Sequence, residues 1–98
     1  MRSRSRGDFI FTVGYDGPVA VVDGRAKRRH GALSTVQLAE AGLFRAAYSS
    51  AVWSGDAAEM DAVVRAYNRA SGSSLTADSN LDRLFGVFPT EVTRTVVL

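Results

Sequence analysis

The stretch "DFIFTVGYDGPVAVVD", residues 8–23, decides the predicted fold. Two runs of apolar, β-branched and aromatic residues flank the dipeptide Asp16-Gly17, which suits the positive-φ positions of a tight hairpin turn. The pattern therefore predicts a β-hairpin. A turn at this dipeptide places Tyr15 opposite Pro18, Val13 opposite Ala20 and Phe11 opposite Val22.

Both faces of the predicted hairpin are largely apolar. One face carries Phe9, Phe11, Val13, Ala20 and Val22, and the other carries Ile10, Thr12, Val19 and Val21. A sheet with two apolar faces avoids water on both sides. We expect one face to pack on helices, and the second to be covered by the C-terminal segment or by another chain.

Two longer helices are predicted after the hairpin. Residues 33–55 begin with Ser34 and Gln37 at the spacing of a capping box. Gly42 either breaks this helix or stays inside it, at a cost of about 1 kcal/mol relative to Ala. Residues 56–72 begin with a second such box, Asp56 and Glu59, and end at a glycine in the position of a helix C-terminus.

The end of the chain predicts one short helix and one strand. "LDRLFG" (81–86) has the pattern of a short helix that stops at a glycine, and "TEVTRTVVL" (90–98) is rich in β-branched residues. The predicted fold is α+β, in the order β-β-α-α-α-β. The N-terminal hairpin and the C-terminal strand form a small, mainly antiparallel sheet, with the helices on one face. Residues 1–7 are predicted to be a flexible basic tail, and residues 8–98 a single globular domain.

The composition argues against an enzyme. The chain has no cysteine and one histidine, His30, so the expected chemistry includes no thiolate, no Cys-based metal site and no pair of histidine ligands. No phosphate-loop spacing or nucleophile elbow is present in the sequence. We expect a non-enzymatic binding protein without a cofactor or metal. We also expect a cytoplasmic location and no membrane partner, since no apolar run approaches the length of a membrane span.

Positive charge is concentrated in the first third of the chain. Residues 1–30 carry seven Lys or Arg and three Asp, whereas residues 31–98 carry five basic and seven acidic residues. Such asymmetry indicates binding to a polyanion. The candidate phosphate-binding residues are Arg2, Arg4, Arg6, Arg25, Lys27, Arg28, Arg29 and His30. We expect the basic tail and the loop 25–30 to meet at the open end of the hairpin and to bind nucleic acid or another polyanion through phosphate groups.

The stretch "LAEAGLFRAAYSSAVW" (38–53) resembles the helix-turn-helix of lactose-repressor-type regulators. The resemblance covers about sixteen residues and implies a DNA-reading second helix that begins near Arg45. The same letters fit a continuous or kinked core helix, in which small Ala and Ser residues allow close packing, and this is the interpretation that we favour.

The alternative function is assembly. The doubly apolar hairpin and a tryptophan at a helix end offer apolar surface for a protein partner or for a second copy of the chain. The candidate interface residues are Ile10, Val19, Val21 and Trp53. The two functions are compatible, because a homo-oligomer would carry several copies of the basic surface.

Overall fold

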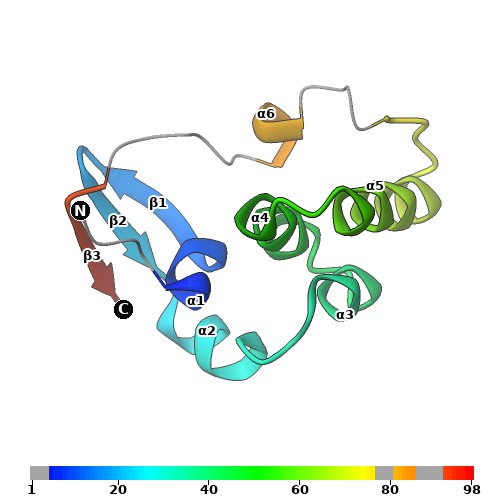
Figure 1. The fold of residues 1–98 in the computed structure, drawn as a ribbon. Coiled ribbons are helices and arrows are strands. Elements are labelled where there is room, and N and C mark those ends of the chain that lie inside the picture. The colour runs from blue at the N-terminus through cyan, green and yellow to red at the C-terminus, as the bar shows by residue number, and fades with distance from the viewer. Residues whose placement is uncertain (1–4, 77–80, 86–91) are drawn as a thin grey trace.

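The computed structural model describes residues 5–76, 81–85 and 92–98, and within them it has six helices and three strands (Figure 1). The elements are α1 (Arg6–Ile10), β1 (Thr12–Asp16), β2 (Val19–Val22), α2 (Gly24–His30), α3 (Thr35–Glu40), α4 (Phe44–Ser54), α5 (Ala57–Ser71), α6 (Leu81–Phe85) and β3 (Arg94–Val97). The protein is α+β, as predicted. The helices lie to one side of the sheet (Figure 1).

The sheet has the order β1-β2-β3 and is mixed. β1 and β2 are antiparallel, as expected for a hairpin, but β3 runs parallel to β2. The expectation of a mainly antiparallel sheet was therefore wrong for the third strand. Thr93 N–H donates to the Pro18 carbonyl where β3 begins, and Leu98 N–H donates to the Val22 carbonyl where it ends. Parallel neighbours need a long crossover, and here all the helices from α2 to α6 supply it.

The hairpin turns one residue later than predicted. Asp16 pairs with Val19, so that Gly17 and Pro18 form the turn, and a register shift lies between Thr12 and Gly14. A turn at Asp16-Gly17 needs positive φ at both residues. No non-glycine residue in the described ranges has positive φ, whereas Gly17 has a φ of +56°. Glycine alone takes the left-handed conformation here, which keeps the aspartate in the strand.

The start of the predicted hairpin is a helix instead. Arg6 and Gly7, expected in the flexible tail, and the following residues to Ile10 form α1. Ser5 caps this helix by accepting a hydrogen bond from Asp8 N–H at 3.2 Å. α1 packs against α4, and Ile10 is only 3% exposed. Ile10 is therefore a core residue, and its prediction as an interface residue was wrong: burial against α4 outweighs the strand propensity of the segment.

Both predicted helix starts carry the predicted N-cap residue, although at α5 only the Asp56 half of the predicted capping box is formed. Ser34 and Gln37 form the predicted capping box at α3. Asp56 accepts hydrogen bonds from Ala58 N–H at 2.8 Å and Glu59 N–H at 3.3 Å at the start of α5. Gly42 has a φ of +81° and separates α3 from α4, so the helix predicted over 33–55 breaks there.

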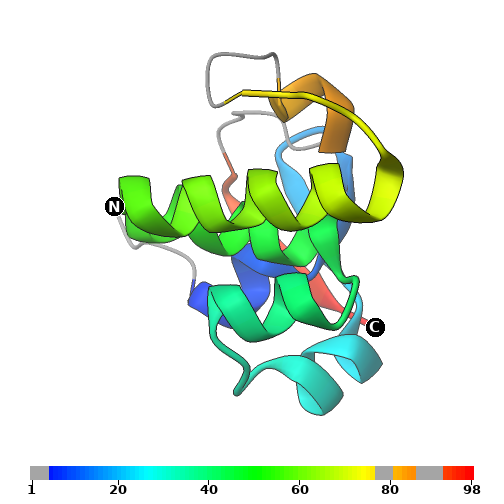
Figure 2. The same ribbon diagram turned by 90° about the vertical axis from the view of Figure 1, so that its right-hand side faces the viewer.

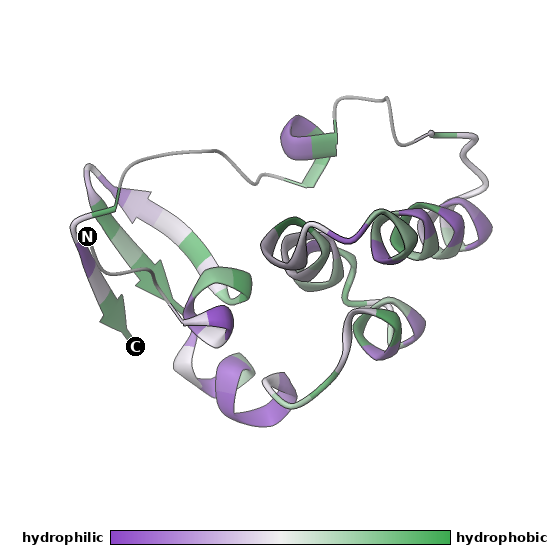
Figure 3. Ribbon diagram, in the orientation of Figure 1, coloured by the Kyte–Doolittle hydropathy of each residue, from purple (hydrophilic) through white to green (hydrophobic). Residues whose placement is uncertain are grey.

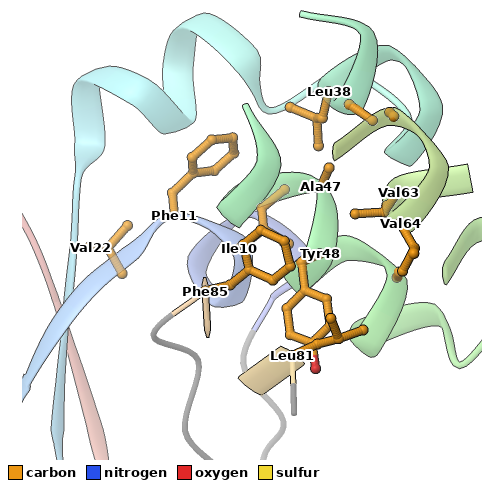
Figure 4. Packing of buried hydrophobic residues seen from close by; sticks show 13 residues of the cluster. Ile10, Phe11, Val22, Leu38, Ala47, Tyr48, Val63, Val64, Leu81 and Phe85 are labelled. Atoms are coloured by element: carbon orange, nitrogen blue, oxygen red, sulfur yellow. The ribbon is translucent and has the colours of Figure 1, made fainter. Parts of the chain in front are cut away.

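The core is built around α4, which contacts α1, α3, α5 and α6. Figure 2 shows α5 lying in front of α4, with α3 below them. Figure 4 shows Ile10, Tyr48 and Phe85 lying close together within this core. Among the described residues, no helix is long and apolar enough to cross a membrane.

Candidate polyanion-binding surface

The basic stretch 24–30 is a helix, not the loop that the sequence suggested. The Asp23 carboxylate accepts a hydrogen bond from Ala26 N–H at 3.1 Å and so caps α2. Arg, Ala and Lys have good helix propensity, and basic residues in a last turn interact favourably with the helix dipole. Figures 1 and 2 show α2 at the lower edge of the molecule. The charges of this stretch therefore have fixed positions along a helix.

Three arginines of α2 share one exposed helix face. Arg25, Arg28 and Arg29 are all exposed, and their i, i+3, i+4 spacing places them side by side. Within the described residues, no carboxylate pairs with any of the three. Most of α2 is coloured as hydrophilic in Figure 3. We call these three residues the α2 arginine face.

Lys27, the remaining cation of α2, is held by an ion pair. Its ammonium lies 2.5 Å from the Asp8 carboxylate of α1. Both side chains are partly shielded from solvent, and the contact fixes α2 against α1. Lys27 is therefore a structural cation, less available for phosphate than the neighbouring arginines.

Arg6 is also engaged in hydrogen bonds within the protein. Its guanidinium donates to the Gly31 carbonyl at 3.2 Å, the Leu33 carbonyl at 2.8 Å and the Ser50 hydroxyl at 2.9 Å. These acceptors lie between 25 and 44 residues further along the chain. Arg6 thus connects the N-terminal helix to the α2–α3 connection and to α4. The sequence predicted that Arg6 and the α2 cations form one phosphate-binding surface. Its contacts instead direct Arg6 to acceptors within the protein.

A chain of hydroxyl groups continues from Arg6 into the helices. The Ser50 and Thr35 hydroxyls lie 2.7 Å apart, and Thr35 donates to the Glu59 carboxylate. Because Thr35 donates to Glu59, the hydrogen between the two hydroxyls must come from Ser50. The order Arg6–Ser50–Thr35–Glu59 therefore links a cation to an anion through two buried hydroxyls. Sequence reasoning missed this network, since its members are 15 to 44 residues apart.

The other candidate cations occupy different places. Arg2 and Arg4 lie outside the described residues. His30, at the end of α2, lines a cavity between the hairpin side of the molecule and the helices. Its imidazole makes no hydrogen bond or ion pair in the part of the chain that the structure describes. Of the six predicted residues that the structure describes, only the three of the α2 arginine face form a continuous exposed cationic surface.

The structure also tests the helix-turn-helix resemblance. α3 and α4 are indeed joined by a turn at Gly42. However, α4 would have to present its side chains to DNA, and its middle is buried. The buried residues of α4 are Ala47, Tyr48, Ser49, Ser50 and Ala51. The segment forms two separate helices rather than one continuous or kinked helix, and the small residues in the middle of α4 pack in the core instead of facing outward.

The predicted interface residues are distributed between core and surface. Val19 and Val21 are partly exposed on the face of β2 opposite to the fully buried Ala20 and Val22. Trp53 is 40% exposed, and its ring centroid lies 5.5 Å from that of Phe9. Val19, Val21 and Trp53 stay predictions as interface residues.

Metal binding and known families give no further guide to the site. In the described ranges, no group of three or more His, Asp or Glu side chains could hold a metal ion. Comparison of the chain with protein-family models, with curated proteins and with solved structures finds no match.

Proposed function

We propose that this protein is a binding protein that contacts nucleic acid, or another phosphate polyanion, through the α2 arginine face. The observation that supports the proposal is the set of three exposed guanidinium groups on one side of a capped helix. Each guanidinium presents a planar fork of donors that matches the oxygens of a phosphate. Such contacts position a protein on a nucleic acid without reading its sequence.

Local electrostatics favour an anionic partner. Like charges three and four residues apart on a helix repel each other by about 0.2–0.5 kcal/mol per pair. Asp23, the nearest acid along the chain, uses a carboxylate oxygen to cap α2 and does not pair with the arginines. A bound phosphate would remove the repulsion and neutralise the surface at the same time.

Salt dependence of binding tests the proposal. Binding of a fluorescent duplex should weaken steeply with salt, and the triple variant R25Q/R28Q/R29Q should flatten the slope of log K against log salt by about 2.7, or 0.9 per lost contact. The matched control R65Q/R69Q/R94Q removes three charges from α5 and β3. An unchanged slope in the α2 variant, or an equal loss in the control, would contradict the proposal.

Assembly through the sheet is the second candidate function. A Cβ placed on Gly14 of β1 would meet nothing within 4 Å, so the sheet is open at that point. Gly14 pairs with Val21, which is partly exposed and pairs in turn with Val96 of β3. The row formed by Gly14, Val21 and Val96 would be the surface that contacts another chain. A light-scattering mass equal to one chain at high concentration, unchanged by V21K, would argue against it. The cytoplasmic location also stays a prediction.

A further inference from the structure

The structure contains a cavity of about 500 Å³ that the proposed function does not use. It lies between the α1, β1 and α2 side of the molecule and the helices α4, α5 and α6, all of which contribute lining residues. Cavities that bind small molecules are about 300–1,000 Å³ and mostly apolar. The size and lining of this cavity therefore fit a small ligand.

Aromatic rings form one wall of the cavity. The ring of Tyr67 meets the rings of Phe44 and Phe85 edge to face, each at a centroid distance of 5.3 Å. These rings come from α5, α4 and α6, and all three line the cavity. Ile10 and Phe11 line it from the other side and are themselves almost fully buried. The wall is thus held in place by packing and offers a preformed apolar surface.

Besides the Tyr67 phenol, the titratable groups at this cavity are one imidazole, one guanidinium and one carboxylate, and the first two can donate hydrogen bonds. His30 of α2 and Arg45 of α4 both line it. The imidazole of His30 makes no hydrogen bond within the described residues and can therefore donate to a ligand. Asp23 also lines the cavity, but its carboxylate accepts from Ala26 N–H at the start of α2. An apolar body and an anionic head group would complement this arrangement.

We propose that the cavity binds a small carboxylate with an apolar tail. The tail lies against the wall of Phe44, Tyr67 and Phe85, and the carboxylate lies at His30 and Arg45. Burial of the tail supplies affinity in proportion to the apolar area removed from water. Charge-assisted hydrogen bonds to the carboxylate supply the selectivity for an anion.

Three probes of equal tail length test the head-group assignment. Octanoate, 1-octanol and octylammonium are titrated into the whole chain, with binding followed by isothermal calorimetry and by amide chemical shifts of residues that line the cavity. Octanoate should bind about tenfold more tightly than either of the others, the effect of one charge-assisted hydrogen bond. The proposal is wrong if octanoate shows no saturable binding, or if octylammonium binds as tightly.

Two variants separate the head-group contacts from the apolar wall. H30L/R45M should lower octanoate affinity about tenfold or more and leave octanol affinity unchanged. The control R65M/R69M removes two cations of α5 that do not line this cavity and should leave both affinities unchanged. A46F fills the cavity from α4 and should weaken all three probes. Wild-type octanoate affinity in H30L/R45M would overturn the proposal, even if A46F fails to fold.

Discussion

Replacing Thr35 by valine should destabilise the protein although it changes almost no volume. Thr35 is 4% exposed, and its hydroxyl stands between Ser50 and Glu59 in the chain of hydroxyls. Valine keeps the β-branched shape of threonine but can neither donate nor accept. Glu59 keeps the Ser54 hydroxyl as a donor, at 3.2 Å. The Ser50 hydroxyl, 2% exposed, loses the oxygen to which it donates.

The cost follows from that one unpaired donor. Leaving a buried polar group unsatisfied costs about 1–3 kcal/mol. For a domain of this size, each 1 kcal/mol lowers Tm by about 4–8 °C. T35V should therefore lower Tm by about 4 °C at least. The α3 cap is not involved, because Ser34 and Gln37 form it.

A double-mutant cycle separates the network from simple packing. S50A removes the donor that T35V leaves unpaired, while Arg6 keeps the carbonyls of Gly31 and Leu33 as acceptors. The double variant should therefore be more stable than the sum of the single losses predicts, by about 1 kcal/mol. Urea unfolding followed by circular dichroism measures all four proteins.

The control is T93V, which makes the same substitution at an exposed position and should change stability by less than about 0.5 kcal/mol. A T35V variant as stable as T93V would refute the reasoning. Strictly additive losses for T35V and S50A would show that the two hydroxyls act independently.

Three further predictions concern other contacts. G24A should cost about 1–3 kcal/mol in urea unfolding, because its Cβ would lie 2.2 Å from the last carbonyl oxygen of the chain, whereas G14A meets open space and should be near neutral. Burial first, and then a hydrogen bond to an α6 carboxylate and the charge of that group, raise the pKa of Tyr48 above its ordinary value of 10.0. The tyrosine of the unfolded chain therefore ionises at a lower pH than that of the folded chain, so the stability that Tyr48 contributes is complete below about pH 10 and is lost above it. Between about pH 9 and pH 11, Y48F should lose less Tm than the wild type. An equal loss of Tm in both proteins would contradict the assignment. D56A should lower stability by about 1 kcal/mol through loss of the α5 cap. D61A removes an exposed ion pair and should lower stability by less than about 0.5 kcal/mol. Equal decreases in Tm for the two variants would show that the cap stabilises the protein no more than the ion pair does.

The starts of α3 and α5 were predictable because their causes are local. The Ser34 and Asp56 caps depend on groups within four residues of one another, whereas the sequence left open whether the helix breaks at Gly42. Backbone donors at a helix start must find acceptors, and a short polar side chain supplies one from the adjacent position. The ion pair between Asp61 and Arg65, at 2.8 Å, depends on the same kind of local geometry, because the two residues are four positions apart on α5.

The candidate site was only partly predictable. The sequence located the cationic segment, but it grouped Arg6 and Lys27 with the phosphate-binding residues. Contacts to residues 19 to 44 positions away hold these two partly buried cations within the protein's own network of contacts. No periodicity in the sequence reports such partners, because only the fold brings α1 against α4 and places Asp8 of α1 beside Lys27 of α2.

The sequence by itself determined the α+β class, the caps of α3 and α5, and the cationic character of residues 24–30, since each depends on composition or on near neighbours. Tertiary structure decided the rest. Packing of Ile10 against α4 converted the start of a predicted strand into α1. The crossover through α2 to α6 set β3 parallel to β2. Lys27 pairs with Asp8 of α1, whereas Arg25, Arg28 and Arg29 remain exposed on α2. A charged side chain stays on the surface when no buried acceptor lies within its reach.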